Sequence, residues 1–122
     1  MRRALGLWLL LLAVYTAALG IDASPGERWS AREAHVLLTA ESIVSDGDVD
    51  LRDEYADGAW RAFGGPPLRP TAGLVDGRLL EPQGIGFPLL VAPAYALGGP
   101  TLVALWLAAI TALGFVFAAA IA

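Results

Sequence analysis

The sequence predicts an all-α integral membrane protein in which apolar helices flank an acidic loop outside the cytoplasm. Apolar residues make up 57% of the 122-residue chain and charged residues only 16%, whereas an average soluble domain carries roughly 25% charged residues. All twelve acidic residues lie between Asp22 and Glu81, together with six of the eight arginines, so this segment has a net charge of −6. The charge distribution therefore divides the chain into an outer segment and two membrane regions.

The first apolar region covers residues 4–21, which contain no charge and no proline. As a helix they would span about 27 Å, close to the roughly 30 Å hydrocarbon core of a bilayer. Two arginines precede the region, so the positive-inside rule places the N-terminus in the cytoplasm. We interpret residues 1–21 as a transmembrane helix or signal anchor; the alternative is a signal peptide cleaved near residues 18–20. Both interpretations place residues 22–84 outside the cytoplasm.

The strongest helix pattern of the acidic loop runs over residues 30–45. Ser30 and Glu33 form an S-x-x-E capping box, and the Asp-Gly pair at 46–47 supplies a stop. The expected apolar stripe consists of Val36, Leu37, Ala40, Ile43 and Val44, and the opposite face carries Arg32, Glu41 and Ser42. We therefore expect an amphipathic helix that lies on the membrane surface or against membrane helices.

The remainder of the loop has weaker patterns. Residues 51–63 form a second helical pattern, and its aromatic residues Tyr55, Trp60 and Phe63 favour the depth of a membrane interface. A Gly-Gly-Pro-Pro run at 64–67 ends this pattern. The Asp-Gly pair within residues 75–80 favours a primed turn and predicts a small hairpin.

The second apolar region is interrupted by Gly-Gly-Pro at 98–100. Residues 85–97 predict a short membrane helix of about 20 Å, which crosses the membrane, re-enters it or forms the first part of a kinked span. Residues 100–122 carry no charge and predict a transmembrane helix, because residues 101–122 alone would span about 33 Å. Because the sequence stops within apolar residues, we expect a fragment of a polytopic bundle.

Three stretches in this order resemble a known family. They read EAHVLLTAES at 33–42, DGDVDL at 46–51 and GIGFPLLVAPAY at 84–95. Together they are similar to the N-terminal part of polyprenyl-phosphate-sugar-dependent glycosyltransferases of the C-type fold, the dolichyl-phosphate-mannose mannosyltransferase-like group. The resemblance implies a hexosyltransferase that moves a sugar from a polyprenyl-phosphate donor to an extracytoplasmic acceptor. The chain would be its N-terminal portion, inactive by itself.

The resemblance implies catalytic roles for Glu33 and His35. The family has an aspartate as general base where this chain has Arg32, and an arginine cannot accept a proton. Glu33 is then the candidate base, and His35 would orient it or bind the donor phosphate. The alternatives are that Glu33 only closes the capping box and that His35 is a partly exposed helix residue.

Donor-phosphate binding is assigned to Arg69, Arg78 and Gln83. A guanidinium can pair bidentately with phosphate oxygens, and Gln83 stands where the family has histidine. The alternative is that both arginines only reach the lipid headgroups. The expected partners are membrane lipid and a polyprenyl-phosphate-linked sugar. Nucleic acid is excluded because the chain has no basic patch.

No cofactor is required by the sequence, and no metal ligand is assigned. The alternating acids at 46, 48 and 50, which are followed by acids at 53, 54 and 57, resemble a calcium loop, but Leu51 and Asp57 stand where an EF-hand needs Gly and Glu. We interpret the segment as a solvated acidic turn, with divalent metal binding as the alternative. The absence of cysteine excludes disulfides and thiolate metal sites.

Two other functions fit the same patterns. One is a small non-enzymatic membrane protein that binds a partner through its acidic outer loop. The other, suggested by Arg32, is a family member that keeps the fold without the reaction.

Overall fold

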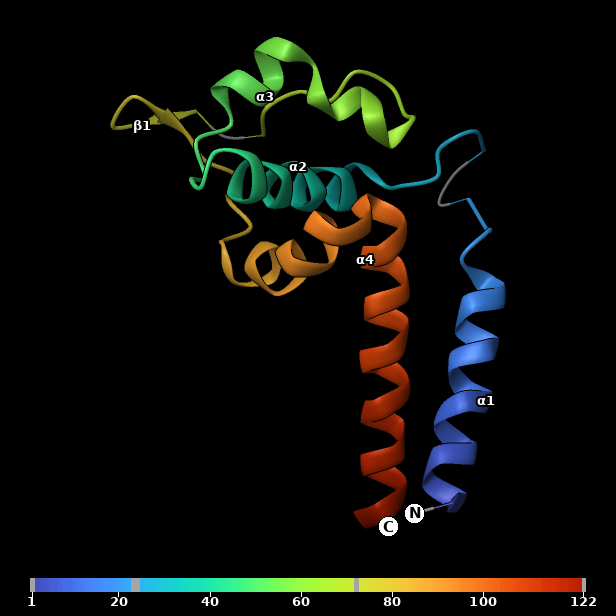
Figure 1. Ribbon diagram of the computed structural model, residues 1–122. Coiled ribbons are helices and arrows are strands. Elements are labelled where there is room, and N and C mark those ends of the chain that lie inside the picture. Colours follow the sequence, from blue (N-terminus) through green and yellow to red (C-terminus); the bar gives the residue numbers. More distant parts are fainter. Residues whose placement is uncertain (1, 23–24, 72, 122) are drawn as a thin grey trace.

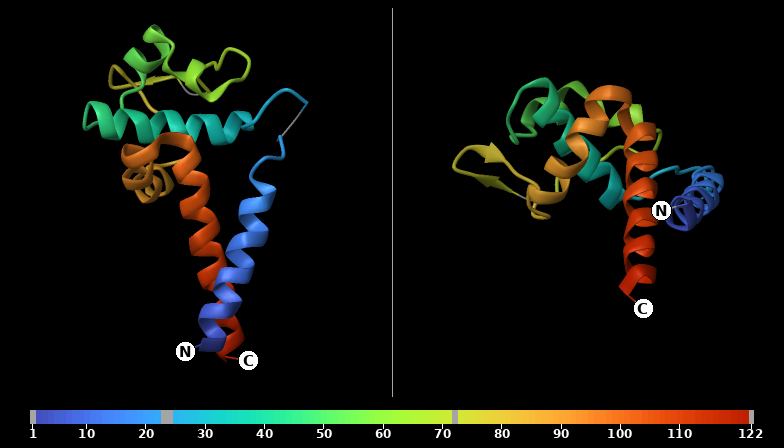
Figure 2. Two further views of the ribbon diagram at one scale, coloured as in Figure 1. Left: turned by 45° about the vertical axis from the view of Figure 1, so that its right-hand side comes forward. Right: turned by 60° about the horizontal axis from the view of Figure 1, so that its bottom comes forward.

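The computed structural model describes residues 2–22, 25–71 and 73–121. Over these residues the chain is mostly helical and has two parts (Figure 1). Helix α1 (Arg2–Ala18) stands beside the C-terminal part of α4 (Gly86–Ile121), and the two run antiparallel. The shorter elements and the first part of α4, which together cover residues 25–71 and 73–97, form an outer layer at one end of this helix pair. Both chain ends lie at the opposite end (Figures 1 and 2).

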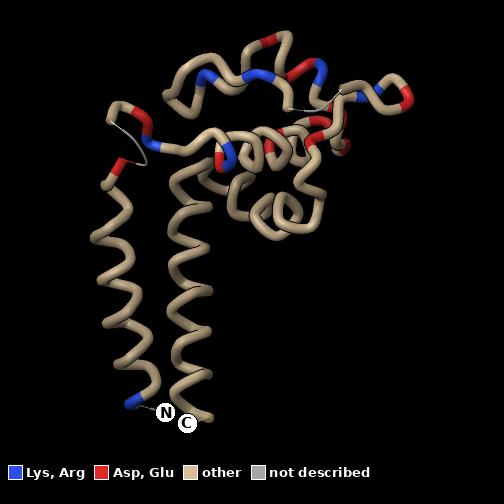
Figure 3. The backbone as a smooth tube through the Cα atoms, turned by 180° about the vertical axis from the view of Figure 1, so that it is seen from behind, with Lys and Arg blue, Asp and Glu red and all other residues tan. Residues whose placement is uncertain are grey.

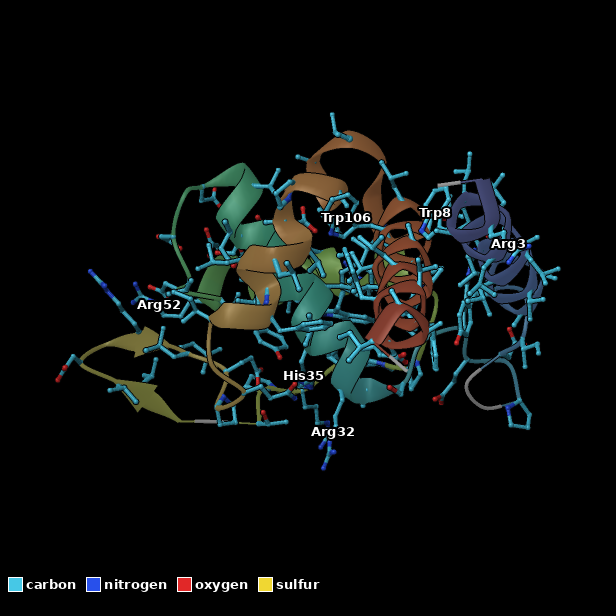
Figure 4. The ribbon with its side chains drawn as sticks, turned by 90° about the horizontal axis from the view of Figure 1, so that it is seen from below. Arg3, Trp8, Arg32, His35, Arg52 and Trp106 are labelled. Atoms are coloured by element: carbon cyan, nitrogen blue, oxygen red, sulfur yellow. The ribbon has the colours of Figure 1, made fainter. Side chains whose placement is uncertain are left out.

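Helix α1 confirms the helix expected in the first apolar region, but it ends at Ala18 rather than residue 21. The following amides of Leu19 and Ile21 bond three residues back, to Thr16 and Ala18, so the chain leaves α1 through a tightened turn. Side-chain contacts between α1 and α4 include the Trp8 indole N–H, which donates to the carbonyl of Ala109 at 3.1 Å. Figure 4 shows Trp8 at the side of α1 that faces α4.

Helix α4 is interrupted where the sequence predicts it. Gly98 and Gly99 have non-helical backbone angles, and the φ of +61° at Gly99 suits only glycine without strain. Residues 86–97 belong to the outer layer, and the rest of α4 turns away from it to stand beside α1 (Figures 1 and 2). Within the described residues, α4 is the one helix long and apolar enough to cross a membrane; α1 is apolar but shorter.

Helix α2 (Ala31–Ser45) begins with the predicted capping box. The Ser30 hydroxyl accepts from the Glu33 amide, and the Glu33 carboxylate accepts from the Ser30 amide at 2.8 Å. Asp46 caps the other end, and Gly47 follows with a φ of +75°. Both predicted ends of this helix are confirmed.

The predicted division of α2 into one apolar and one polar face is only partly confirmed, since Leu37 and Ala40 are buried and Arg32 is exposed as expected. Ser42, expected on the polar face, is fully buried, and Val44, expected in the apolar stripe, is 41% exposed. The reason is that α2 lies between residues 86–97 on one side and the rest of the outer layer on the other (Figures 1 and 2). A helix packed on two sides buries residues around most of its circumference.

The helical pattern at 51–63 forms two elements, α3 (Arg52–Asp57) and a 3-10 helix, η1 (Ala59–Phe63). Gly58 separates them in the left-handed conformation, with a φ of +72°. Phe63, expected at a membrane interface, is instead 4% exposed and belongs to the core cluster with Leu38 and Leu51. Helices α3 and η1 cover the side of α2 that faces away from residues 86–97 (Figure 1).

The predicted hairpin is confirmed. Strands β1 (Leu74–Val75) and β2 (Arg78–Leu79) pair antiparallel, and the turn residues Asp76 and Gly77 both have positive φ, as a type I′ turn requires. The hairpin is tied to the start of α3, because the Leu51 amide donates to the Leu79 carbonyl at 2.9 Å.

Charge follows the same division of the molecule. In Figure 3 every described acidic residue lies in or next to the outer layer, and the helix pair carries charge only at the start of α1. The apolar pair and the charged layer are therefore separate in space as well as in sequence.

Candidate functional site

The outer layer contains a polar cluster made of His35, Tyr55, Thr71 and Glu81, in which the side chains of His35 and Glu81 are buried, Tyr55 is half-buried and Thr71 is exposed. Helix α2 supplies His35 and α3 supplies Tyr55, while Thr71 and Glu81 flank the hairpin in sequence. His35 Nδ1 lies 3.0 Å from Glu81 Oε1, and the Tyr55 hydroxyl donates to the same oxygen at 2.7 Å. The Thr71 hydroxyl donates to the other carboxylate oxygen. Four distant segments thus meet at one carboxylate.

The short distance between His35 and Glu81 favours one tautomer of His35. The Glu81 carboxylate accepts from both hydroxyls, and a hydrogen on Nδ1 of His35 avoids placing a ring lone pair against a carboxylate oxygen 3.0 Å away. The lone pair of neutral His35 is then on Nε2. Among the described residues, none hydrogen-bonds Nε2. An imidazole oriented by a carboxylate in this way has the arrangement of a general base.

Tyr55 keeps its role as a donor over a wide pH range. Burial raises the pKa of its phenol well above the ordinary value, and the hydrogen bond to Glu81 raises it further. The phenol therefore remains protonated at neutral pH, and its ring meets that of His35 edge-on, with centroids 6.5 Å apart. Tyr55 supports the pair without carrying charge.

His35 lies between two cavities. The first, of about 310 Å³, has aromatic walls of Trp29, Trp60 and Phe63, with Arg69 at its edge. The second, of about 430 Å³, is more polar and includes Gln83. The first lies at the lower end of the size range of small-molecule sites, and its apolar lining with few polar groups is typical of them.

The structure gathers some of the candidate residues around this ring. His35 and Arg69 line the first cavity, and His35 and Gln83 line the second. His35 is only 3% exposed, so the alternative of a partly exposed helix residue is wrong. Figure 4 shows His35 and Arg32 on the same side of α2, with Arg32 pointing outward.

Two candidates lie away from the ring. Glu33 is exposed, and one of its carboxylate oxygens accepts from both the amide and the hydroxyl of Ser30. Arg78 lies on β2 and lines a different pocket, next to Asp48 and Asp50. Glu33 is thus engaged in the helix cap, and Arg78 is remote from the two cavities of His35.

Three members of the cluster were missed by sequence reasoning. Tyr55 appeared only as an interfacial aromatic, and Thr71 and Glu81 received no role. The partners of His35 lie 20 and 46 residues along the chain, so no local spacing connects them. The one local hint is Glu81 itself, an isolated acid just before a long apolar region.

The acidic turn is also less solvated than expected. Glu54 on α3 is 5% exposed, whereas Asp46 and Asp53 beside it are exposed. Burial, and then the neighbouring Asp53, raise the pKa of Glu54 to about 7. The interpretation of a fully solvated turn is therefore wrong at Glu54, because α3 packs this side chain toward the buried Ser42.

No family model, curated protein or solved structure matches this chain. Any function of the His35 cluster must therefore be argued from its geometry and chemistry, and the glycosyltransferase resemblance stays a prediction.

Proposed function

We propose that this chain forms the N-terminal, outer-surface portion of a membrane glycosyltransferase-like protein, with His35 as the general base. The observation that carries the proposal is the buried His35–Glu81 pair, of which His35 lines an aromatic-walled cavity. The side chains of His35 and Glu81 are 4% and 5% exposed, so the surrounding side chains fix their positions and exclude most of the solvent.

The proposed step is transfer of a sugar from a polyprenyl phosphate to an acceptor hydroxyl. The acceptor oxygen attacks the anomeric carbon while its proton passes to Nε2 of His35. The bond from the anomeric carbon to the phosphate oxygen breaks, and the polyprenyl phosphate leaves with that electron pair. Glu81 stabilises the imidazolium that forms, as the carboxylate of a catalytic triad does.

The cavity supplies binding groups for such a donor. The rings of Trp29, Trp60 and Phe63 can cover the apolar C–H faces of a hexose. Arg69 at the cavity edge can pair bidentately with a phosphate. In this proposal Arg69 and Gln83 keep their predicted phosphate role, and Arg78 has none because of its remote position.

A lipid tail can be placed beside the same residues. A mostly apolar groove adjoins the second cavity, and Gln83 belongs to both. Phe87, Val103 and Leu107 line the groove, and so do Arg32 and Glu33. The groove follows α4, the helix long enough to cross a bilayer. An amphiphile could therefore place its phosphate near Gln83 and its chain along α4.

The test measures release of polyprenyl phosphate from short-chain polyprenyl-phosphate hexoses by the complete gene product in lipid nanodiscs. We expect His35→Gln to lower the transfer rate by a factor of about 100 or more, in the range of general-base contributions. Donor binding, followed by the fluorescence of the cavity tryptophans, should change little.

The matched control for Glu81→Gln is Asp76→Asn, which removes an exposed acid at the hairpin turn. We expect Glu81→Gln to slow transfer at least tenfold, and Asp76→Asn to leave it unchanged. Wild-type transfer rates in the His35→Gln variant would overturn the proposal.

A further inference from the structure

Another pocket of the outer layer, which we call the acidic pocket, is lined mostly by acidic residues. It lies between the end of α2 and α3, has a volume of about 290 Å³, and is independent of the cavities around His35. Its five acidic residues are Glu41, Asp46, Asp53, Glu54 and Asp57. One carboxylate oxygen from each of Asp46, Asp53 and Glu54 lies within 4.8 Å of the other two.

Glu54 is the unusual member of this group. Its side chain is 5% exposed, and neither carboxylate oxygen has a hydrogen-bond partner among the described residues. Two nearby hydroxyls are already used, since Ser42 donates to Asp48 and Ser45 donates to Asp46. Buried polar atoms almost always have partners, and an unpaired buried carboxylate is strongly unfavourable. The side chain thus points to a ligand that binds carboxylates.

Side chains of the described chain do not supply that partner. Arg52 pairs with Asp50, which is outside the pocket, at 2.7 Å. The guanidinium of Arg61 donates to the backbone carbonyl of Asp57 rather than to a carboxylate. Five acids therefore share one pocket, and among the described residues none of them forms an ion pair.

We propose that Asp46, Asp53 and Glu54 bind a calcium ion. Calcium prefers carboxylate oxygens at 2.3–2.6 Å, so two ligands of one ion are at most about 5 Å apart, which the observed grouping within 4.8 Å satisfies. The set contains no nitrogen or sulfur donor, which disfavours zinc and copper. Water fills the remaining positions through the open side of the pocket, because Asp46 and Asp53 are exposed.

The ion would add a second link between two elements that His35 and Tyr55 already connect through Glu81. Asp46 is the C-cap of α2, and Asp53 and Glu54 lie in the first turn of α3. Tyr55, next in the chain, holds the Glu81 carboxylate. Calcium would thus fix α3 on α2. This role does not depend on the function proposed above.

The test uses the complete protein in detergent micelles, titrated with calcium chloride against sodium chloride of equal ionic strength. Calorimetry should show one saturable ion, with half-saturation at roughly 0.1–1 mM, the range of exposed extracellular calcium sites. The melting temperature should rise by about 5–10 °C at 10 mM calcium.

The decisive variants are Glu54→Gln and Asp53→Asn. Each removes one ligand charge at nearly constant volume, and each should weaken calcium binding at least tenfold. Glu54→Gln also removes the buried charge, so a melting temperature without calcium at or above that of the wild type shows that it folds. Asp76→Asn is the control and should bind calcium as the wild type does. An absence of saturable binding in the wild type, or undiminished binding in both variants, would overturn the proposal.

Discussion

The outer layer and the helix pair hold their apolar residues in opposite ways. In the outer layer Leu38 and Leu51 are completely buried, and a four-residue polar cluster connects the elements. In the helix pair large apolar side chains are exposed, such as Leu10, which is 63% exposed, and Phe117, which is 61% exposed. One part encloses its own core, and the other presents apolar surface outward.

This difference teaches where each part obtains its stability. Soluble monomers rarely expose apolar patches as large as two helix faces, so the pair needs an apolar surrounding. We propose that this surrounding is a bilayer, with the charged layer at its outer surface. The same kind of substitution should then have different consequences in the two parts.

The largest effect is expected from Leu38→Ala in the outer layer. The side chain is fully buried, so its truncation should lower the free energy of unfolding by about 2–5 kcal/mol. The measurement is chemical unfolding in micelles followed by tryptophan fluorescence. Val44→Ala, on the same helix but 41% exposed, is the control and should cost less than about 1 kcal/mol. Equal losses in both variants would show that the layer has no defined core.

Leu10→Arg tests the helix pair. Leu10 is exposed, as Val44 is, but we expect its substitution by a charged residue to be strongly unfavourable because it would lie in the bilayer. A charge at the centre of a membrane helix costs about 2.5–3.5 kcal/mol of insertion free energy. Because α4 would still anchor the chain, the measurement is the insertion of α1 itself: in proteoliposomes we expect α1 of the variant to be cleaved by added protease, whereas α1 of the wild type stays protected. Val75→Arg makes the same exchange at a 54% exposed site of the hairpin and should leave α1 protected. Cleavage within α1 of the wild type would show that α1 does not lie in the bilayer.

Features encoded by neighbouring residues were predicted from the sequence. The capping box at Ser30, the Asp76-Gly77 turn and the break at Gly98 all appear as expected. Each depends on the conformation or hydrogen bonding of a few successive residues, so the signal is complete within a short window. The boundary between the apolar regions and the acidic loop is equally local.

Features that depend on packing were not predicted. Ser42 reads as a polar-face residue, but α3 and the loop before it cover it, and its hydroxyl donates to Asp48. The His35–Glu81 pair exists only because the segment after the hairpin passes beside α2. Helical periodicity describes one buried face, so it could not indicate that α2 is covered on two sides.

Tyr55→Phe probes the polar cluster and should have an intermediate effect. The variant loses a hydrogen bond to a carboxylate, which lowers the free energy of unfolding by about 1.5–3 kcal/mol at neutral pH. Because the folded-state pKa of Tyr55 is raised, its contribution is complete below about pH 10 and is lost as the pH rises through that raised value. The gap between wild type and variant should therefore narrow under alkaline conditions. A gap that widens above pH 10 would contradict the assignment.

The smallest effects are expected at the start of α2, where they separate capping from catalysis. Ser30→Ala removes the cap oxygen and should lower the free energy of unfolding by about 1 kcal/mol.

Glu33→Gln keeps an oxygen that can accept from the Ser30 amide, so it should lower the free energy of unfolding by less than about 0.5 kcal/mol. Both are measured by thermal unfolding, and Glu33→Gln also by the transfer assay. Because Glu33 is engaged in the cap and lines the groove proposed for the lipid chain rather than the cavity shared by His35 and Arg69, we expect Glu33→Gln to retain transfer. If transfer is lost while stability is kept, the base is Glu33 and the buried His35–Glu81 pair only holds the layer together.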